Sequence, residues 1–244
     1  MKIHFAICAA ALAVVACSKT ETAGDAGVAA KRMPLPDCSE VETVDAGADG
    51  WKHPDCRLML TDASGLAIEA RYAPAEDDST TVAVQVVAPG DATLQTIDET
   101  MGNTFEPISL TDIDKDGRND IRIPLETGNV NTSWAIWRQK EDGKSFVRIG
   151  EPSGVSIINT QDGYIAVQAR SSANEWSVEF YKLEADELKL ITTAAVVARG
   201  EPDKITGVEC SLTDEGDLAA AGLDPKVAET QFCAEPAVAD IFKQ

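Results

Sequence analysis

The sequence predicts a mainly β protein, with an antiparallel meander that forms a sandwich or barrel-like domain and ends in a short disulfide-stapled helical tail. Short apolar segments rich in Trp, Ile, Val and Phe follow one another, and tight-turn sequences separate them. Helix-capping signals appear only near the carboxyl end. With 244 residues, 44% of them hydrophobic, the chain is long enough for one domain with its own core and an appendage.

The first segment predicts a targeting signal, with residues 1–16 as a lipoprotein signal peptide. Lys2 is followed by an apolar run over 3–15 that is too short to span a bilayer, and then by Val14-Val15-Ala16-Cys17. This stretch resembles the lipobox of bacterial lipoproteins. The resemblance implies cleavage before Cys17, acylation of Cys17 with chains such as palmitate, and, because Ser18 follows, an outer-membrane location facing the periplasm. The alternative is an ordinary secretory signal or an uncleaved helix.

Composition and charge indicate how the chain is attached and limit the classes of partner it can bind. Residues 17–37 are small and polar and predict a flexible tether. The formal net charge of −20 repels the phosphates of nucleic acids and of anionic lipid headgroups. We therefore expect no nucleic-acid partner and attachment to the membrane through the N-terminal lipid alone. Cations or a basic protein are the natural partners.

Residues 38–205 are expected to form the β domain. Glu141-Asp142-Gly143-Lys144 and Gln161-Asp162-Gly163 predict turns, and Asp-Gly favours a tight primed turn. Trp134 and Trp137 should lie on opposite faces of one strand, since side chains alternate along a strand. The expected strands cover residues 65–72, 80–87, 92–97, 133–138, 145–149, 155–160, 164–170, 176–183 and 188–197.

Residues 206–244 are expected to form the helical tail. A first helix is predicted over Thr213–Ala221, ending at Gly222. Asp224-Pro225 then supplies an N-cap followed by proline at the first position of a second helix.

Four cysteines remain in the mature chain besides Cys17. In an exported chain an even number predicts disulfides, and four cysteines allow three pairings. We favour Cys38–Cys56 with Cys210–Cys233, each closing a loop of roughly 20 residues that would constrain the unfolded chain by about 3 kcal/mol. Free buried thiols are the alternative.

An aspartate-rich loop is the clearest candidate for a functional site in the sequence. Over residues 112–120, carboxylates occupy loop positions 1, 3, 5 and 9, and Gly117 at position 6 permits a sharp turn. Calcium prefers six to eight oxygen ligands, which such a loop supplies. Ile123 replaces the glutamate at position 12 of an EF-hand, so we predict a different, structural calcium loop. A solvated acidic turn held by Asx-type hydrogen bonds is the alternative. The predicted ligands are Asp112, Asp114, Asp116, the backbone carbonyl of Arg118, and Asp120.

Together with this loop, several later residues resemble the calcium-loop β proteins of the bacterial envelope. These residues are Asn129, Asn131, Trp134, Trp137, Gly143 and Phe146. The proteins include FG-GAP repeats and, more closely, the periplasmic inhibitors of invertebrate-type lysozyme and their lipoprotein relatives. The resemblance covers residues 60–200. FG-GAP propellers need many copies of the loop, and this sequence has one.

The resemblance implies an inhibitory loop. In the inhibitor family a Ser-Gly-x-Tyr loop enters the lysozyme cleft, and here Ser153-Gly154-Val155-Ser156 keeps the serine and the glycine but lacks the tyrosine. A plain turn before a strand is the alternative. Ser153 and Gly154 are thus the candidate inhibitory residues, and a basic envelope protein such as a lysozyme is the expected partner.

Enzymatic activity is not expected. His53 is the only histidine after the signal, no nucleophile elbow, P-loop or dinucleotide motif occurs, and nothing selects a carboxylate pair such as Glu99 and Glu106. The function expected is therefore protein binding by a lipid-anchored envelope protein with a calcium-stabilised β domain. A structural or assembly outer-membrane lipoprotein is the first alternative. The second is a glycan-binding module that uses Trp51, Trp134, Trp137 and Trp176.

Overall fold

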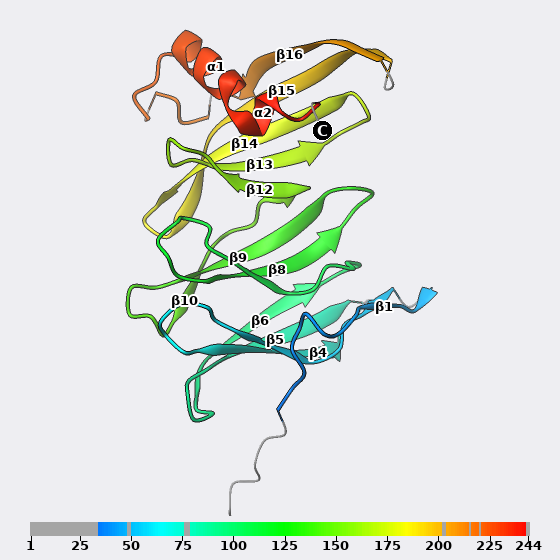
Figure 1. The fold of residues 1–244 in the computed structure, drawn as a ribbon, viewed down its shortest axis with the longest axis vertical. Helices are drawn as coiled ribbons and strands as arrows, with labels where there is room; N and C mark the ends of the chain where they lie inside the picture. Colours follow the sequence, from blue (N-terminus) through cyan, green and yellow to red (C-terminus); the bar gives the residue numbers. More distant parts are fainter. Residues whose placement is uncertain are drawn as a thin grey trace, which may run out of the picture. The chain divides into compact units, whose positions relative to one another are not determined.

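The computed structural model describes residues 34–47, 50–75, 79–201, 204–214, 216–219 and 221–242. The predicted signal peptide, the acylation site at Cys17 and most of the tether lie outside these residues. From Leu35 onward the chain forms one compact unit of antiparallel sheets with two short helices near the carboxyl end (Figure 1). The prediction of a mainly β fold with an antiparallel meander is confirmed. None of the helices among the described residues has the length and apolar character needed to cross a membrane.

The first meander is a four-stranded sheet in the order β3-β4-β5-β6. Its core comes from alternation in β5, where Val82, Val84 and Val86 are all buried. A separate two-stranded sheet, β1 (Val44–Asp45) with β2 (Trp51–Lys52), precedes it. The four strands are β3 (Cys56–Met59), β4 (Ala67–Pro74), β5 (Thr80–Val87) and β6 (Thr93–Met101).

The second sheet carries the acidic loop. Its order is β10-β9-β8-β7, and the short strand β11 (Ser153–Gly154) also pairs with β9. Trp134 is buried, whereas Trp137 is partly buried and packs in a different apolar cluster, so their placement on opposite faces is confirmed. The other strands are β7 (Ser109–Thr111), β8 (Asp120–Thr127), β9 (Thr132–Gln139) and β10 (Phe146–Gly150).

The third sheet has five strands in chain order, from β12 to β16. The predicted Asp-Gly turn joins its first two strands, and Gly163 adopts φ 81°, which glycine accommodates without strain. The strands are β12 (Ser156–Asn159), β13 (Ile165–Arg170), β14 (Glu175–Glu184), β15 (Glu187–Glu201) and β16 (Lys204–Asp214).

The helix expected over Thr213–Ala221 is wrong. Thr213 and Asp214 end β16, where Asp214 pairs with Thr193 of β15, and residues 216–219 and 221–222 form turns. The sheet therefore continues beyond position 205, where we expected the helical tail to begin. Pairing with a neighbouring strand overrides the local helical preference of this segment.

The second expected helix and both disulfides are confirmed. Helix α1 (Pro225–Ala234) starts at the N-cap Asp224, whose side chain accepts hydrogen bonds from the N–H groups of Lys226 and Val227, and α2 (Pro236–Ala239) follows it. Phe232 of α1 packs against Phe180 of the third sheet with ring centroids 4.6 Å apart. The structure pairs Cys38 with Cys56 and Cys210 with Cys233.

Candidate metal centre

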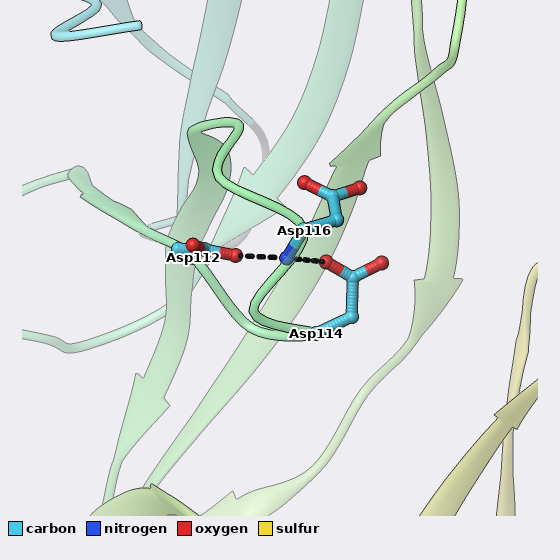
Figure 2. Close-up of side chains that lie close together, drawn as sticks. All are labelled: Asp112, Asp114 and Asp116. Carbon is cyan, nitrogen blue, oxygen red and sulfur yellow. Dashed lines mark hydrogen bonds between the residues drawn. The ribbon is translucent and has the colours of Figure 1, made fainter. Parts of the chain in front are cut away.

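The loop between β7 and β8 brings three carboxylates together. One oxygen from each of Asp112, Asp114 and Asp116 lies within 4.8 Å of the other two, and Figure 2 shows the three side chains around one bend. Lys115 at φ 59° and Gly117 at φ 83° produce the tight reversal. The alternate spacing read from the sequence thus places its first three aspartates in one group, here called the acidic cluster.

Backbone amides hold the acidic cluster in place. The N–H of Asp116 donates to Oδ1 of Asp112 at 3.0 Å and to Oδ1 of Asp114 at 3.2 Å, and the N–H of Gly117 donates to Oδ2 of Asp112 at 3.1 Å. These contacts orient the carboxylates of Asp112 and Asp114. They are also the Asx-type contacts of a solvated acidic turn, so they agree with both sequence interpretations.

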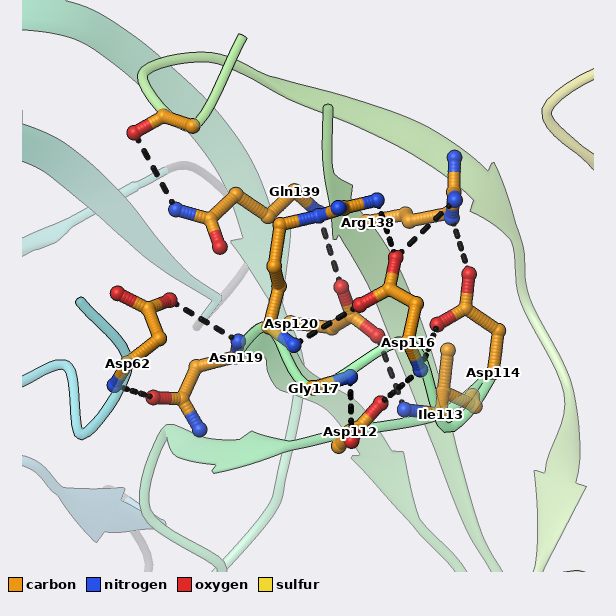
Figure 3. A network of polar contacts seen from close by, with 12 residues as sticks. Asp62, Asp112, Ile113, Asp114, Asp116, Gly117, Asn119, Asp120, Arg138 and Gln139 are labelled. Atoms are coloured by element: carbon orange, nitrogen blue, oxygen red, sulfur yellow. Dashed lines mark hydrogen bonds and ion pairs between the residues drawn. The ribbon is translucent and has the colours of Figure 1, made fainter. Parts of the chain in front are cut away.

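Two arginines partly neutralise the acidic cluster. Arg138 of β9 donates to Asp114 and, at 3.2 Å, to Asp116 (Figure 3). Arg118 also donates to Asp116. Charge-assisted hydrogen bonds of this kind offset repulsion among neighbouring carboxylates. A metal ion at the cluster would share the Asp114 and Asp116 carboxylates with these guanidinium groups.

Asp120, the fourth predicted carboxylate ligand, is completely buried and directed to the backbone. Its Oδ2 accepts from the N–H of Ile113 and its Oδ1 from the N–H of Gln139, both at 2.9 Å. Burial raises the pKa of Asp120 to about 7; these two hydrogen bonds oppose the shift, and the charges of Asp114 and Asp116 add to it. Asp120 therefore ties the loop to β9. Its coordination of calcium, like that of the Arg118 carbonyl, stays a prediction.

Segments far away in the sequence hold both ends of the loop. Asn159 of β12 donates Nδ2–H to the carbonyl oxygen of Asp112 at 3.1 Å. At the other end, Oδ1 of Asn119 accepts from the N–H of Thr61 at 2.6 Å, and the backbone N–H of Asn119 donates to Oδ2 of Asp62 at 3.2 Å. The loop is thus held by the second sheet to which it belongs, by the β3–β4 connection of the first sheet and by β12 of the third.

No family model matches the sequence, and no curated protein matches it. Among solved structures, the chain is similar to one described as the structure of a Xanthomonas type IV secretion system related protein. The two share 13% sequence identity with a TM-score of 0.39, and the match covers 72% of this chain and 95% of that chain.

The candidate inhibitory residues lie in a paired strand. Ser153 pairs with Ser133 and Gly154 with Thr132 of β9. Gly154 is buried, and a Cβ atom there would lie 2.2 Å from the carbonyl oxygen of Gln168, so backbone packing alone requires this glycine. Ser153 is exposed, so only the first residue of the pair is open to a partner.

Five other residues named from the sequence have partners within the fold. Glu106 accepts from Trp134 Nε1 at 2.9 Å, and Glu99 accepts from Trp137 Nε1 at 2.8 Å. Trp134 is only 1% exposed and is therefore unsuited to a surface platform for glycans. His53 stacks on Tyr72 and contacts the Thr104 carbonyl at 2.9 Å, and burial lowers the pKa of His53.

Sequence reasoning missed Arg138 as a neighbour of the acidic cluster. A signal for it exists in β9, where Trp134 and Ile136 are buried and share the face of Arg138. A charged residue on the inward face of a strand normally has a charged partner.

Proposed function

We propose that this chain is a non-enzymatic, lipid-anchored protein of the bacterial envelope whose β domain is stabilised by calcium and binds a basic protein, in the manner of a lysozyme inhibitor. The observation that carries the proposal is the convergence of Asp112, Asp114 and Asp116 within 4.8 Å on a loop fixed at both ends. Its expected location is the outer membrane, facing the periplasm.

The chemistry of the acidic cluster suits calcium. Calcium accepts carboxylate and carbonyl oxygens in flexible arrangements, with water completing the shell. Three carboxylates, the Arg118 carbonyl and Asp120 form the proposed ligand set. Since the backbone amides already orient Asp112 and Asp114, little ordering remains to be done on binding. The role proposed for the ion is structural.

Charge supports a basic partner. A net charge of −20 accelerates encounter with a positively charged protein and makes the association sensitive to salt. Ser153 lies in the segment that continues to Val155 and Ile158, and all three side chains are exposed. Exposed apolar side chains beside a polar residue give this segment, residues 153–158, the composition of a contact surface.

Inhibition of a panel of lysozymes from different families tests the proposal. The purified protein should slow at least one basic lysozyme, with an inhibition constant that rises steeply with salt concentration. Ile158→Asp should weaken inhibition at least tenfold. Val208→Asp, at a 50% exposed position in β16, is the matched control and should leave it unchanged. Failure to bind any lysozyme at low salt, or inhibition unaffected by Ile158→Asp, would contradict the proposal.

A further inference from the structure

A cavity of about 420 Å³ lies beside the small sheet of β1 and β2, away from the acidic cluster and the segment 153–158. Its lining combines aromatic residues with the apolar end of β4 and the residue after it, namely Trp51, His53 and Tyr72 with Ala73, Pro74 and Ala75. A mostly apolar hollow of this volume is typical of a site that holds one side chain or a small ligand.

Trp51 brings an indole ring to this cavity. Its ring centroid lies 5.8 Å from that of Phe105, and the two ring planes are tilted by 59°. A tilted contact of this kind does not cover both faces of the indole. The residue is only partly buried, so part of its ring is accessible at the cavity.

Two other tryptophans of the chain have a guanidinium group over the ring. That of Arg122 lies 5.3 Å from the ring centroid of Trp134, and that of Arg170 lies 5.7 Å from the ring centroid of Trp176. Guanidinium groups are attracted to the negatively polarised face of an indole. Trp51 has no such cation among the residues that the structure describes, so its ring is open to an arginine from outside.

Asp45 places a carboxylate next to the Trp51 ring. The two residues are directly opposite each other in the β1–β2 pair, so their side chains lie on one face of that sheet. Oδ1 of Asp45 accepts from the N–H of Gly47 at 2.8 Å, and the exposed carboxylate forms no ion pair within the described part of the chain. An indole and a carboxylate on one face match a guanidinium group, which is planar and donates several N–H bonds to carboxylates.

The other polar groups at the cavity do not oppose a cation. Burial lowers the pKa of His53, so its ring is uncharged near neutral pH. Lys52 also contributes to the lining, but it follows Trp51 in β2 and pairs with Val44, which directs its side chain to the opposite face of the small sheet. The net charge of −20 favours the approach of a positively charged protein.

We propose that this cavity, together with Asp45, binds an arginine side chain of a basic protein. The guanidinium lies over the Trp51 ring and donates to the Asp45 carboxylate, and the aliphatic stem of the arginine contacts Pro74. The site rests on the proposed function in one respect, that the partner is basic, and it adds a place where that partner is held.

NMR spectra of the isotope-labelled protein test the site with three probes: N-acetylarginine amide, N-acetylcitrulline amide and N-acetyllysine amide. Citrulline resembles arginine in shape but has no charge, and lysine has the charge without the planar guanidinium. The indole N–H signal of Trp51, identified by its loss in Trp51→Phe, should shift most with the arginine probe, less with the lysine probe and not with the citrulline probe. The indole signals of Trp134, Trp137 and Trp176 should not move.

An unmoved Trp51 signal, or an equal shift with the citrulline probe, would overturn the site. An equal shift with the lysine probe would overturn the assignment to arginine.

A charge variant locates the binding. Asp45→Asn should weaken binding of the arginine probe about fivefold, because it removes the negative charge and keeps the shape of the side chain. Asp45 is exposed, so this variant leaves the core intact. Asp217→Asn, the same change at an exposed position after β16, is the matched control and should leave the affinity unchanged. Equal affinity in the parent and Asp45→Asn would contradict the role of the carboxylate.

The site and the proposed function can fail separately. If the arginine probe binds and no lysozyme is inhibited, the site holds and the lysozyme partner is wrong. If a lysozyme is inhibited and the arginine probe does not bind, the site is wrong and the proposed function holds.

Discussion

Asn159 and Asp112 are joined by a hydrogen bond between a side-chain amide and a backbone carbonyl, 3.1 Å long. Asn159 ends β12 of the third sheet, and Asp112 begins the acidic loop of the second. Lys115 adds contacts from the same loop to the carbonyls of Asn159 and Thr160. The position of the first proposed calcium ligand therefore depends on the hairpin of another sheet.

Asn159→Ala should lower the free energy of unfolding by about 1 kcal/mol, because it removes one hydrogen bond. It should also weaken calcium binding, since Asp112 loses its anchor. Calorimetric titration with calcium and urea unfolding measure the two effects. Asn174→Ala, which removes an exposed contact to the Gly200 carbonyl, is the matched control. Equal calcium affinity in the parent and Asn159→Ala would show that the anchor does not position the cluster.

Calcium should stabilise the folded chain. A ligand that binds only the folded state adds about 2.7 kcal/mol at a hundredfold excess over its Kd. Chelation should lower the Tm, and calcium should restore it. In Asp114→Ala the Tm should respond less to chelator than in the parent, because a ligand is lost and repulsion in the empty loop is relieved. Equal Tm shifts with calcium, magnesium and matched ionic strength would instead identify a solvated acidic turn.

Asp120 should make stability depend on pH when calcium is removed. Its pKa is raised from 3.8 to about 7, so the folded state binds a proton that the unfolded chain has released. Below pH 3.8 Asp120 is protonated in both the folded and the unfolded chain, and its contribution to the free energy of unfolding is fully present. That contribution is lost as the pH rises through about 7. The resulting decrease in the free energy of unfolding is up to about 4 kcal/mol. Urea unfolding in chelator from pH 4 to pH 8 should show this decline, and Asp120→Asn should flatten it.

Gly154→Ala should destabilise the protein by roughly 1–3 kcal/mol, the usual cost of overpacking. The added Cβ would lie 2.2 Å from the Gln168 carbonyl oxygen. Gly207→Ala is the matched control in β16, since a Cβ there meets no other atom of the described residues within 4 Å. Thermal unfolding compares the two variants. If Gly154→Ala is as stable as Gly207→Ala, packing does not explain this glycine.

Cys17→Ser should abolish acylation, because lipobox processing acts on the cysteine sulfur. The variant should leave the membrane fraction and should partition into the aqueous phase of a detergent extraction, whereas the parent remains in the detergent phase. Mass spectrometry of the N-terminal peptide gives an independent reading. Continued membrane extraction of the variant would contradict the lipoprotein assignment.

Sequence patterns predicted most of the strands because their signals are local. The Asp162-Gly163 turn, the alternation around Val178 and the N-cap at Asp224 each depend on a few neighbouring residues. The segment after Cys210 was predicted wrongly, since it becomes a strand by pairing with β15, and no local pattern identifies that pairing. The division of the strands into separate sheets is likewise set by long-range pairing.

In the acidic cluster, too, the local features could be predicted from the sequence and the long-range contacts could not. The spacing of Asp112, Asp114 and Asp116 predicted their convergence, which needs only a tight turn. Arg138 and Gln139 come from β9, which the sheet register brings next to the loop. Asp120 could be chosen as a ligand from its spacing, but its burial against two backbone amides depends on that same register.

The anchoring of the acidic loop bears on the order of events during folding. Its nine residues are contiguous, but the contacts at its ends span 58 residues to Thr61 and 47 residues to Asn159. Contacts so distant in sequence form only after the intervening chain has closed, which costs entropy. A cation that recognises the completed loop therefore acts after the rate-limiting step, slowing unfolding and leaving the folding rate nearly unchanged.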